Sequence, residues 1–571
     1  MKLLLMVFLP ALAAAQLPAP PMPSPVGAPS IWQRLPVTAS GALNVSSELY
    51  RHSAGSADRR PGASWRVSMS PRLQLFNEIG MGTEVLLSSE GSEFRQNMDQ
   101  VGLNPSWRWA TVHAGDFSRD YSSYTLTGTR LRGFGVDLQP GRFLFSVQGG
   151  QAQRTVSAGS DGAAYKRSML AASLGYGRAG RNRIALTMLK AKDDPNSLEQ
   201  KLVRVDTTAI LDTALVADPL RFATTPQENL VVGIETELTL FRNMLRFKGQ
   251  GGASLFTRDL RSQTVSDVNV GPLGGISSLQ PLRLSTNADA AYEGELELRL
   301  SRFGLRGGYE KVGAGYTSLG LPYLINDRQG FHVGGNVMLF SNRLALQGDT
   351  RMQSNNLLGQ KSARTDRSTS TLSAMATIRP TLSVATTVLL SGAASAKSDA
   401  APGIDMRTTA VSSTITNRTS VMGRATALSV TYAFQNSRDV LPGSVIPGTT
   451  GNNVTSSITT AFSPTLSAGP SFSIVKSATV GQVAQGNALL GMTLRAKLLS
   501  DNRLQVNGNV SNTFSSGRQV RAMRAEAQYP VLWGTSLSVQ ARHTAYSRYA
   551  SRAAFNESFL TMGITRSVSS R

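Results

Sequence analysis

The sequence predicts an all-β protein, a transmembrane up-and-down antiparallel β-barrel of about 24 to 26 strands over residues 41–571. Three observations predict this class. Apolar and polar residues alternate at every second position over most of the chain. Short and long connections alternate between the segments. Most segments are about 10 to 14 residues long, which suits a tilted strand that crosses a bilayer.

The N-terminus has the features of an export signal. Lys2 supplies a positive charge, residues 3–12 are apolar, and alanines at 13–15 fit the small-residue rule for cleavage. We expect residues 1–15 to be a signal peptide and not a membrane anchor, because the apolar run is too short to span a bilayer. Residues 16–40 are rich in proline and are predicted to form an extended linker or a plug-like tail.

The stretch from Phe331 to Leu339 shows the alternation most clearly. Its odd-numbered positions are apolar or glycine, whereas His332, Gly334 and Asn336 occupy even positions. The alternation resumes at Leu344, after the polar dipeptide Ser341-Asn342. The stretch therefore predicts two strands joined by a tight turn. A helix would repeat every three or four residues instead. The same alternation recurs at 292–300, 504–511 and 535–545.

Tight turns and longer polar connections follow each other in alternation. Tight turns are expected at 139–141, 242–243, 302–303, 341–342, 379–380, 463–464, 501–502 and 529–530, and longer connections near 116–127, 192–228, 258–287, 313–329, 353–368, 392–405 and 437–452. Turns at one end and loops at the other are typical of a membrane barrel. Only a closed barrel pairs every edge N–H and C=O group in lipid, and 555–568 is the expected closing strand.

Composition excludes several other classes. Only 41% of the residues are hydrophobic, and no internal run approaches the roughly 18 apolar residues of a spanning helix. Cysteine is absent, so neither disulfides nor thiolate metal sites are expected. The formal charge of +22 allows an anion-attracting pore, contacts with lipid phosphates, or nucleic-acid binding. Nucleic-acid binding is disfavoured, because the basic residues are dispersed and no binding motif occurs.

Polar residues at alternate positions over many strands imply an aqueous interior, since a solid core would leave them unpaired. The candidate lumen charges are Glu293, Glu295, Glu297, Arg299 and Arg306. The first four share one face of a predicted strand, and Arg306 and Glu310 on the following strand are expected to pair with them. We favour a wall of cross-strand ion pairs over a cation-binding site.

No motif for catalysis, a cofactor or a metal occurs in the sequence. The four histidines lie far apart and lack metal-ligand spacing: His52, His113, His332 and His543. There is no GxSxG nucleophile elbow and no phosphate-binding loop. We therefore expect a protein that is not an enzyme and needs no cofactor. A hydrolase built from one Ser, one His and one acid that the fold brings together stays open as an alternative.

Residues 104–154 are the most distinctive segment. Trp107 and Trp109 lie two residues apart, so they share a face and are candidates for an aromatic girdle at a membrane interface. The segment also contains a motif of small, acidic, aromatic and basic residues: Gly115, Asp116, Phe117, Arg132, Gly133 and Gly135. From the residues alone, Gly133, Gly135 and the pair Gly149-Gly150 favour close strand packing or a bend in the barrel wall.

This GD…RG motif resembles the segment found near the start of large outer-membrane secretion barrels, the fimbrial ushers and the type IX secretion translocon. The resemblance implies a conduit or scaffold for secretion or surface assembly, with a periplasmic or secreted protein as its partner. The barrel pattern itself favours a passive, porin-like channel with an anion preference. A surface adhesin or structural barrel is a third alternative.

The predicted barrel implies a location in the bacterial outer membrane. Its expected partners are outer-membrane lipid, lipopolysaccharide and the outer-membrane assembly machinery, and no nucleic acid. The connection 192–228 is the candidate gate, because Leu202, Ile210 and Leu211 among others give it enough apolar residues to fold inward. A loop that is ordered outside the barrel is the alternative for this connection.

Overall fold

The structure is a computed structural model of the 571-residue chain. It describes residues 37–569 except for 54–59, 77, 90–98, 157–162, 179–180, 199–223, 266–278, 397–402, 443, 445, 500, 516, 532–533 and 549–552. The predicted signal peptide and most of the predicted linker therefore lie outside the described residues. Among the described residues, no helix is long and apolar enough to cross a membrane.

Every regular element in the described part of the chain is a β-strand. The first fourteen are β1 (Val37–His52), β2 (Ala63–Met69), β3 (Arg72–Leu75), β4 (Ile79–Ser88), β5 (Gln100–Trp107), β6 (Ala110–Ser118), β7 (Arg130–Leu138), β8 (Phe143–Gln153), β9 (Arg167–Gly177), β10 (Arg183–Asp193), β11 (Glu228–Leu240), β12 (Leu245–Thr257), β13 (Thr286–Arg299) and β14 (Phe303–Val312). The others are β15 (Arg328–Leu339), β16 (Leu344–Asn355), β17 (Thr365–Arg379), β18 (Leu382–Ser395), β19 (Ile404–Val421), β20 (Arg424–Asp439), β21 (Thr449–Ser463), β22 (Leu466–Thr479), β23 (Gln485–Leu498), β24 (Leu504–Ser515), β25 (Arg518–Pro530), β26 (Thr535–Tyr546) and β27 (Phe555–Ser569).

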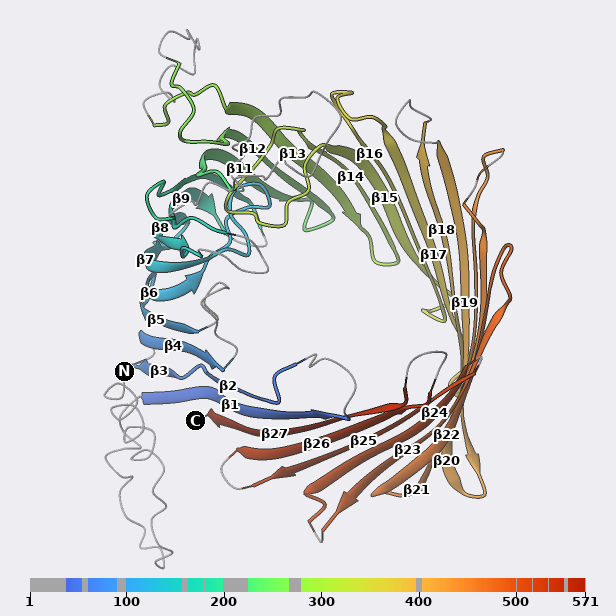
Figure 1. The fold of residues 1–571 in the computed structure, drawn as a ribbon. Coiled ribbons are helices and arrows are strands. Elements are labelled where there is room, and N and C mark those ends of the chain that lie inside the picture. The colour runs from blue at the N-terminus through green and yellow to red at the C-terminus, as the bar shows by residue number, and fades with distance from the viewer. Residues whose placement is uncertain are drawn as a thin grey trace, which may run out of the picture.

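These strands form one closed antiparallel sheet, seen end-on in Figure 1. From β4 onward each strand pairs with the next, and β27 returns to pair with β1 from Ser40↔Ser569 to His52↔Glu557. Strands β2 and β3 both pair with β1 and with β4, so they are two pieces of one strand. The structure therefore confirms an up-and-down barrel, and its strand number is 26.

The break between β2 and β3 has a local cause. Pro71 follows Ser70 at the break, and proline has no N–H to donate to a ladder. Gly41 of β1 faces the break, where an added Cβ would lie 2.8 Å from the Cα atom of Pro71. Glycine therefore lets the neighbouring strand approach a proline that a side chain would exclude.

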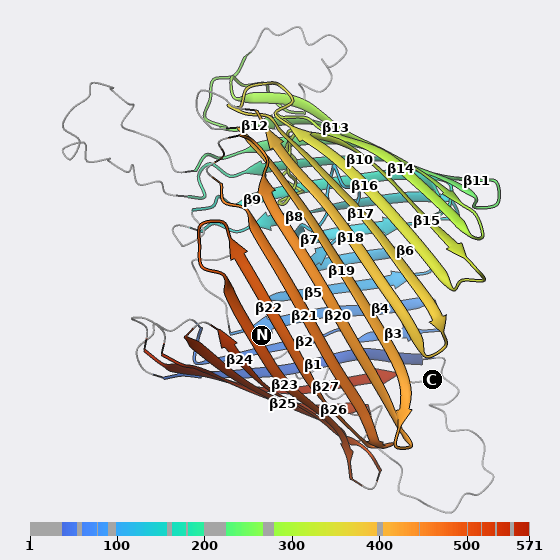
Figure 2. The same ribbon diagram turned by 90° about the vertical axis from the view of Figure 1, so that its right-hand side faces the viewer.

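The two ends of the barrel differ. One end carries tight turns such as 241–244 and 340–343, in which Asn243 and Asn342 adopt left-handed φ values of 72° and 68°. The other carries most of the long loops, although the connections 480–484 and 516–517 at that end are short. The strands run obliquely between these two ends (Figure 2). Strand β1 begins at Val37, four residues before the expected start of the barrel, beside the end of β27 at the short-turn end.

Candidate functional site

Two loops from the long-loop end, 119–129 and 313–327, lie inside the ring of strands (Figure 1). Thr125 of the first lies 2.8 Å from Thr187 of β10, and Asn229 of β11 accepts a backbone N–H of the second at 3.0 Å. Thr187 and Asn229 therefore point inward. Because side chains alternate along a strand and the strand register is continuous, the inward residues of all other strands follow. We call this surface the inner wall.

The outward face of the sheet is apolar. Leu186 of β10 is 55% exposed and Leu490 of β23 is 52% exposed, and both point away from the inner wall. Other exposed members are Leu170, Leu174, Val232, Ile234, Leu296, Leu305, Val333, Leu372, Leu390, Val510, Met523, Val539 and Met562. Covering such a face with hydrocarbon gains about 25 cal/mol per Å² of apolar area. The barrel thus presents lipid-compatible side chains around its circumference.

The acidic row predicted on β13 faces the inner wall. Arg299 donates to Glu297 through Nε and Nη2 at 2.7 Å each, and the Nε2 atom of His332 lies 3.2 Å from Glu295. Glu293 accepts from the Gln250 side chain and from the Tyr124 hydroxyl. Each carboxylate of the row therefore has a polar partner among the described residues.

The expected partners of this row were wrong for two side chains. Register places Arg306 opposite Glu297, but its guanidinium donates to Asp349 of β16 at 2.9 Å. Glu310 likewise pairs with Arg328 of β15 at 2.6 Å. Both bonds run away from β13, that of Arg306 to β16 and that of Glu310 to β15, because Arg299 already occupies Glu297. The ion pairs therefore extend sideways along the wall from β13 to β16.

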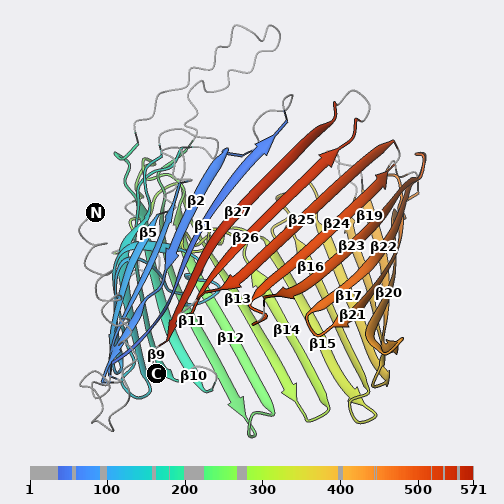
Figure 3. The same cartoon turned by 90° about the horizontal axis from the view of Figure 1, so that it is seen from below.

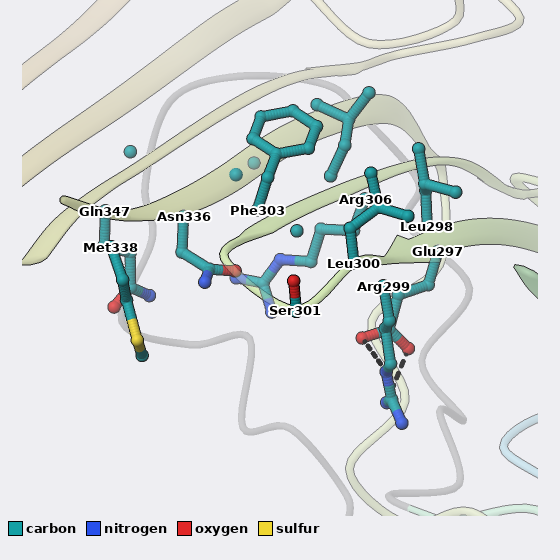
Figure 4. A pocket seen from close by; sticks show the side chains of 15 residues that line it. Glu297, Leu298, Arg299, Leu300, Ser301, Phe303, Arg306, Asn336, Met338 and Gln347 are labelled. Carbon is teal, nitrogen blue, oxygen red and sulfur yellow. Dashed lines mark hydrogen bonds and ion pairs between the residues drawn. The ribbon is translucent and has the colours of Figure 1, made fainter. Parts of the chain in front are cut away.

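A recess of about 350 Å³ opens at the short-turn end of this sector (Figure 4). Arg299, Arg306 and Asn336 line it, beside residues of the turn between β13 and β14. The two arginines are bound to Glu297 and Asp349, so the charges that line the recess are already neutralised. The recess therefore offers hydrogen-bonding groups without a surplus of either charge.

The loops 119–129 and 313–327 pack together into a structure that we call the shelf. Tyr316 donates its hydroxyl to the Tyr124 carbonyl, and Ser318 donates to the Thr125 carbonyl at 2.6 Å. A buried apolar cluster joins the shelf to the wall, with Tyr121 and Leu126 from the shelf and with Phe117, Leu131, Met169, Leu189, Val231 and Val312 from the strands. The shelf is therefore fixed to the wall by both apolar burial and polar bonds.

Tyr124 is the polar anchor of the shelf. Its hydroxyl lies 3.2 Å from Glu293 and 3.4 Å from Glu310, and the residue is only 1% exposed. Burial, together with the two carboxylates, raises the pKa of Tyr124 above its ordinary value, so the phenol stays protonated and remains a donor. Tyr124 carries no local sequence signal of this role, because its partners are distant in the chain.

A second polar cluster brings together a serine, an aspartate and a histidine on the inner wall. Ser146 donates to Asp137 at 2.5 Å, and the Nε2 atom of His113 lies 2.9 Å from the other oxygen of the same carboxylate. Arg119 of the shelf also pairs with Asp137. A hydrolase triad requires the imidazole between serine and acid, whereas here the carboxylate lies in the middle. The cluster is therefore arranged to hold Arg119, and His113 does not face the Ser146 hydroxyl as a base.

The inner wall changes character between β18 and β22. Strands β18 and β21 contain no charged residue, and hydroxyl groups pair across neighbouring strands. Thr408 and Ser437 lie 2.9 Å apart, as do Thr414 and Thr431. This sector offers mainly uncharged donors and acceptors, with Arg418 and Asp439 as inward charges near the strand ends, in contrast to the ion pairs of β10 to β16.

Trp107 and Trp109 lie at the short-turn end, between β5 and β6. Their ring centroids are 5.7 Å apart and the two residues are 46% and 43% exposed. Arg108 between them has a left-handed φ of 45°, lies over the Trp107 ring and donates to Glu78 at 2.7 Å. The pair is placed where an interfacial girdle would lie, and that role remains a prediction.

The residues of the GD…RG motif meet across β6 and β7. Arg132 donates to Asp116 through Nε at 3.0 Å and Nη2 at 2.9 Å, on the outward face. The same carboxylate accepts the Val101 N–H at 3.0 Å, which joins β5 to the pair. Gly115, with a φ of 87°, lets the backbone turn there. The acidic and basic members of the motif therefore pair with each other.

The remaining motif residues lie at close approaches between strands. A Cβ on Gly133 would lie 2.6 Å from the Cα atom of Gly150. One on Gly135 would lie 3.2 Å from the ring of Phe117, which is 5% exposed beneath the shelf. These positions need small residues for packing, whatever else the motif does.

The predicted gate falls largely outside the described residues, since 199–223 includes Leu202, Ile210 and Leu211. Within the described ranges, no three His, Cys, Asp or Glu side chains gather as they would around a metal ion. No site for a cofactor was predicted.

Comparison with known proteins gives no family. No protein-family model matches the chain, and no curated protein sequence matches it. Among solved structures, the chain resembles the siderophore receptor PirA of Pseudomonas aeruginosa at 10% identity and a TM-score of 0.39, covering 92% of this chain and 80% of that one. It resembles OccAB3 of Acinetobacter baumannii at 10% identity and a TM-score of 0.30, covering 60% and 93%.

A third similar structure, OprD of Pseudomonas aeruginosa, matches at 12% identity with a TM-score of 0.30, over 60% of this chain and 90% of that one. Scores this low carry no argument about what this chain binds or transports. The resemblance of the GD…RG segment to secretion barrels is not confirmed by any of these matches.

Proposed function

We propose that the protein is a passive channel of the bacterial outer membrane, which admits solutes through water inside the barrel and prefers anions. The observation that carries the proposal is the division of the closed wall into two faces. Large exposed apolar side chains cover its outside, whereas ion pairs and hydroxyl groups line its inside. In lipid, such a barrel leaves no unpaired sheet edge.

The number of strands supports an aqueous interior. Barrels of eight strands are filled by their own side chains, and the interior widens roughly in proportion to the strand number. With 26 strands, the inner side chains of this barrel cannot meet across the centre. Because the inner wall is polar, water is the medium that satisfies its exposed groups.

Positive charge on one sector of the inner wall supports the anion preference. Strands β23 to β26 present five basic side chains and one acidic side chain inward: Arg495, Lys497, Arg518, Arg524, Arg542 and Glu526. Fixed positive charge along an aqueous path raises the local anion concentration. The ion pairs of β10 to β16 contribute no comparable surplus.

Planar lipid bilayers test the proposal with the full chain purified in detergent. We expect stepwise conductance and, under a potassium chloride gradient, a reversal potential displaced toward that of chloride. A reversal potential displaced toward potassium would contradict the anion preference. A barrel that inserts without conducting, and that co-purifies with a polypeptide, would instead support the alternative of a secretion conduit.

A further inference from the structure

Four inward residues share one register line across the strands where the barrel closes. Arg524 of β25 is directly opposite Arg542 of β26, which is opposite Phe559 of β27, which is opposite Tyr50 of β1. Figure 3 shows these strands side by side. Two arginines and two aromatic rings therefore lie next to one another on the inner wall.

Two like charges directly opposite each other destabilise a strand pair. Arg524 has Glu526 at 3.5 Å, and Gln540 accepts from its guanidinium once the amide is oriented to do so. In the part of the chain that the structure describes, Arg542 makes no ion pair. Arg524 and Arg542 together thus keep an uncompensated positive charge, which lies on the exposed Arg542 inside the barrel.

Aromatic rings hold the guanidinium groups in place. Arg542 and Arg60 each lie 5.6 Å from the centroid of the Phe559 ring, and Tyr50 packs on that ring at 4.9 Å. Cation–π contacts of this kind contribute about 0.5–1 kcal/mol at exposed sites. They orient Arg542 without neutralising its charge, so the guanidinium edge remains available to a ligand.

A second set of rings extends the same surface. Tyr546 stacks on Phe555 with centroids 4.3 Å apart, and Arg518 lies 5.0 Å from the Tyr546 ring. The nearby carboxylates have partners: Glu48 pairs with Arg60 at 3.3 Å, and Glu557 accepts the Tyr50 hydroxyl at 3.1 Å. We name this surface the seam patch, formed by Tyr50, Arg60, Arg518, Arg524, Arg542, Tyr546, Phe555 and Phe559.

We infer that the seam patch binds organic anions, taking a carboxylate or phosphate group between Arg524 and Arg542. Guanidinium forks bind both groups through paired N–H bonds, and a bound anion removes the repulsion between the two facing cations. The adjacent Phe559 ring, which is half-buried and is backed by the buried Tyr50, receives the carbon skeleton of the solute. The inference rests on the proposed channel and names the class of solute that it holds.

Block of chloride current tests the patch, with citrate as the carboxylate probe and inorganic phosphate as the phosphate probe. We expect at least one of them to block the wild-type current saturably. The half-blocking concentration should rise about tenfold in Arg542→Gln and in Arg524→Gln. Arg542→Lys should give an intermediate rise, because it keeps the charge and loses the fork. Arg521→Gln is the matched control, since Arg521 is exposed on the outward face of the same strand as Arg524.

Each outcome decides the inference. Block by citrate alone assigns a carboxylate to the site, and block by phosphate alone assigns a phosphate. Either result, or block by both probes, supports the site if the block is weakened in Arg542→Gln and in Arg524→Gln. Block by neither probe, or equal block in wild type and both variants, overturns it. If the wild type does not conduct, the proposed channel fails. Calorimetric titration of the same probes into the protein in nanodiscs, compared with Arg542→Gln, then tests the patch separately.

Discussion

At the scale of single residues, Tyr124 resolves an electrostatic conflict on the inner wall. Register places Glu293 of β13 directly opposite Glu310 of β14, and like charges at such a position destabilise a strand pair. The hydroxyl of Tyr124 lies within hydrogen-bonding distance of both carboxylates. A buried neutral donor thus links the two acids and attaches the shelf at the same point.

Replacing Tyr124 with Phe should loosen the shelf. The change leaves the ring in place but removes the donor to Glu293 and Glu310, and a hydrogen bond of this kind contributes about 0.5–1.5 kcal/mol. We expect faster hydrogen–deuterium exchange across residues 119–129. Tyr432→Phe is the control, because its hydroxyl bonds Asn452 at 3.0 Å on the outward face, away from the shelf. Unchanged exchange in Tyr124→Phe would mean that this bond does not hold the shelf.

At the scale of elements, one buried carboxylate joins two loops. Asp327, at the end of loop 313–327, pairs with Lys361 and accepts the Leu357 N–H at 2.8 Å, both in loop 356–364. Burial alone would raise the pKa of Asp327, but the bonds to Lys361 and Leu357 outweigh it and lower the pKa below 3.8. The bond network therefore favours the ionised carboxylate.

This shift predicts a pH dependence of the loop contact. Because the folded pKa lies below the unfolded value, the pair stabilises the fold above pH 3.8, and the stabilisation is lost as the pH falls through the folded pKa. Asp327→Asn should increase hydrogen exchange in residues 356–364 at pH 7. The difference from wild type should shrink in acid.

Asp366→Asn is the matched control for the loop contact. Asp366 pairs with Arg364 at 3.1 Å, but both side chains are 58% exposed, and exposed pairs contribute little. We expect it to leave the exchange of 356–364 nearly unchanged. An Asp327→Asn variant that behaves like Asp366→Asn at neutral pH would show that the buried pair does not join the loops.

At the scale of the whole molecule, the barrel depends on the seam between its first and last strands. Strands β1 and β27 are separated by the rest of the chain, yet their register runs without a break from Ser40 to His52 of β1. An open seam would expose a row of unpaired N–H and C=O groups to lipid. The barrel must therefore close before it can be stable in the membrane.

A disulfide across the seam tests closure. Because the sequence contains no cysteine, the two introduced cysteines can pair only with each other within the chain. Ser47 and Met562 are directly opposite, and such residues have Cα atoms about 4.5–5.5 Å apart, within disulfide range. The double variant Ser47→Cys, Met562→Cys should crosslink under mild oxidation, as seen by mass spectrometry. Ser47→Cys with Ile415→Cys of β19 should not, and equal crosslinking of both pairs would contradict the seam.

The sequence by itself determined the class of fold and the two faces of its wall. A repeat of two residues, as in 331–339, fixes which side chains share a face, because the pleat of a strand alternates them geometrically. Connection lengths determined which end carries turns, and the even strand number follows from closure with both termini at one end. The alternation and the connection lengths depend on residues that are close in the chain, so the sequence is enough to predict them.

Only the tertiary structure decided which inner side chains meet. Tyr124 lies 169 residues from Glu293, and neither residue carries a local signal for the other. Arg306 faces Glu297 in the register and yet binds Asp349, because Arg299 already holds that carboxylate. Phe559 likewise meets Tyr50 only when β27 pairs with β1 and closes the barrel. Such contacts depend on competition among groups that are distant in sequence, and only packing in three dimensions resolves that competition.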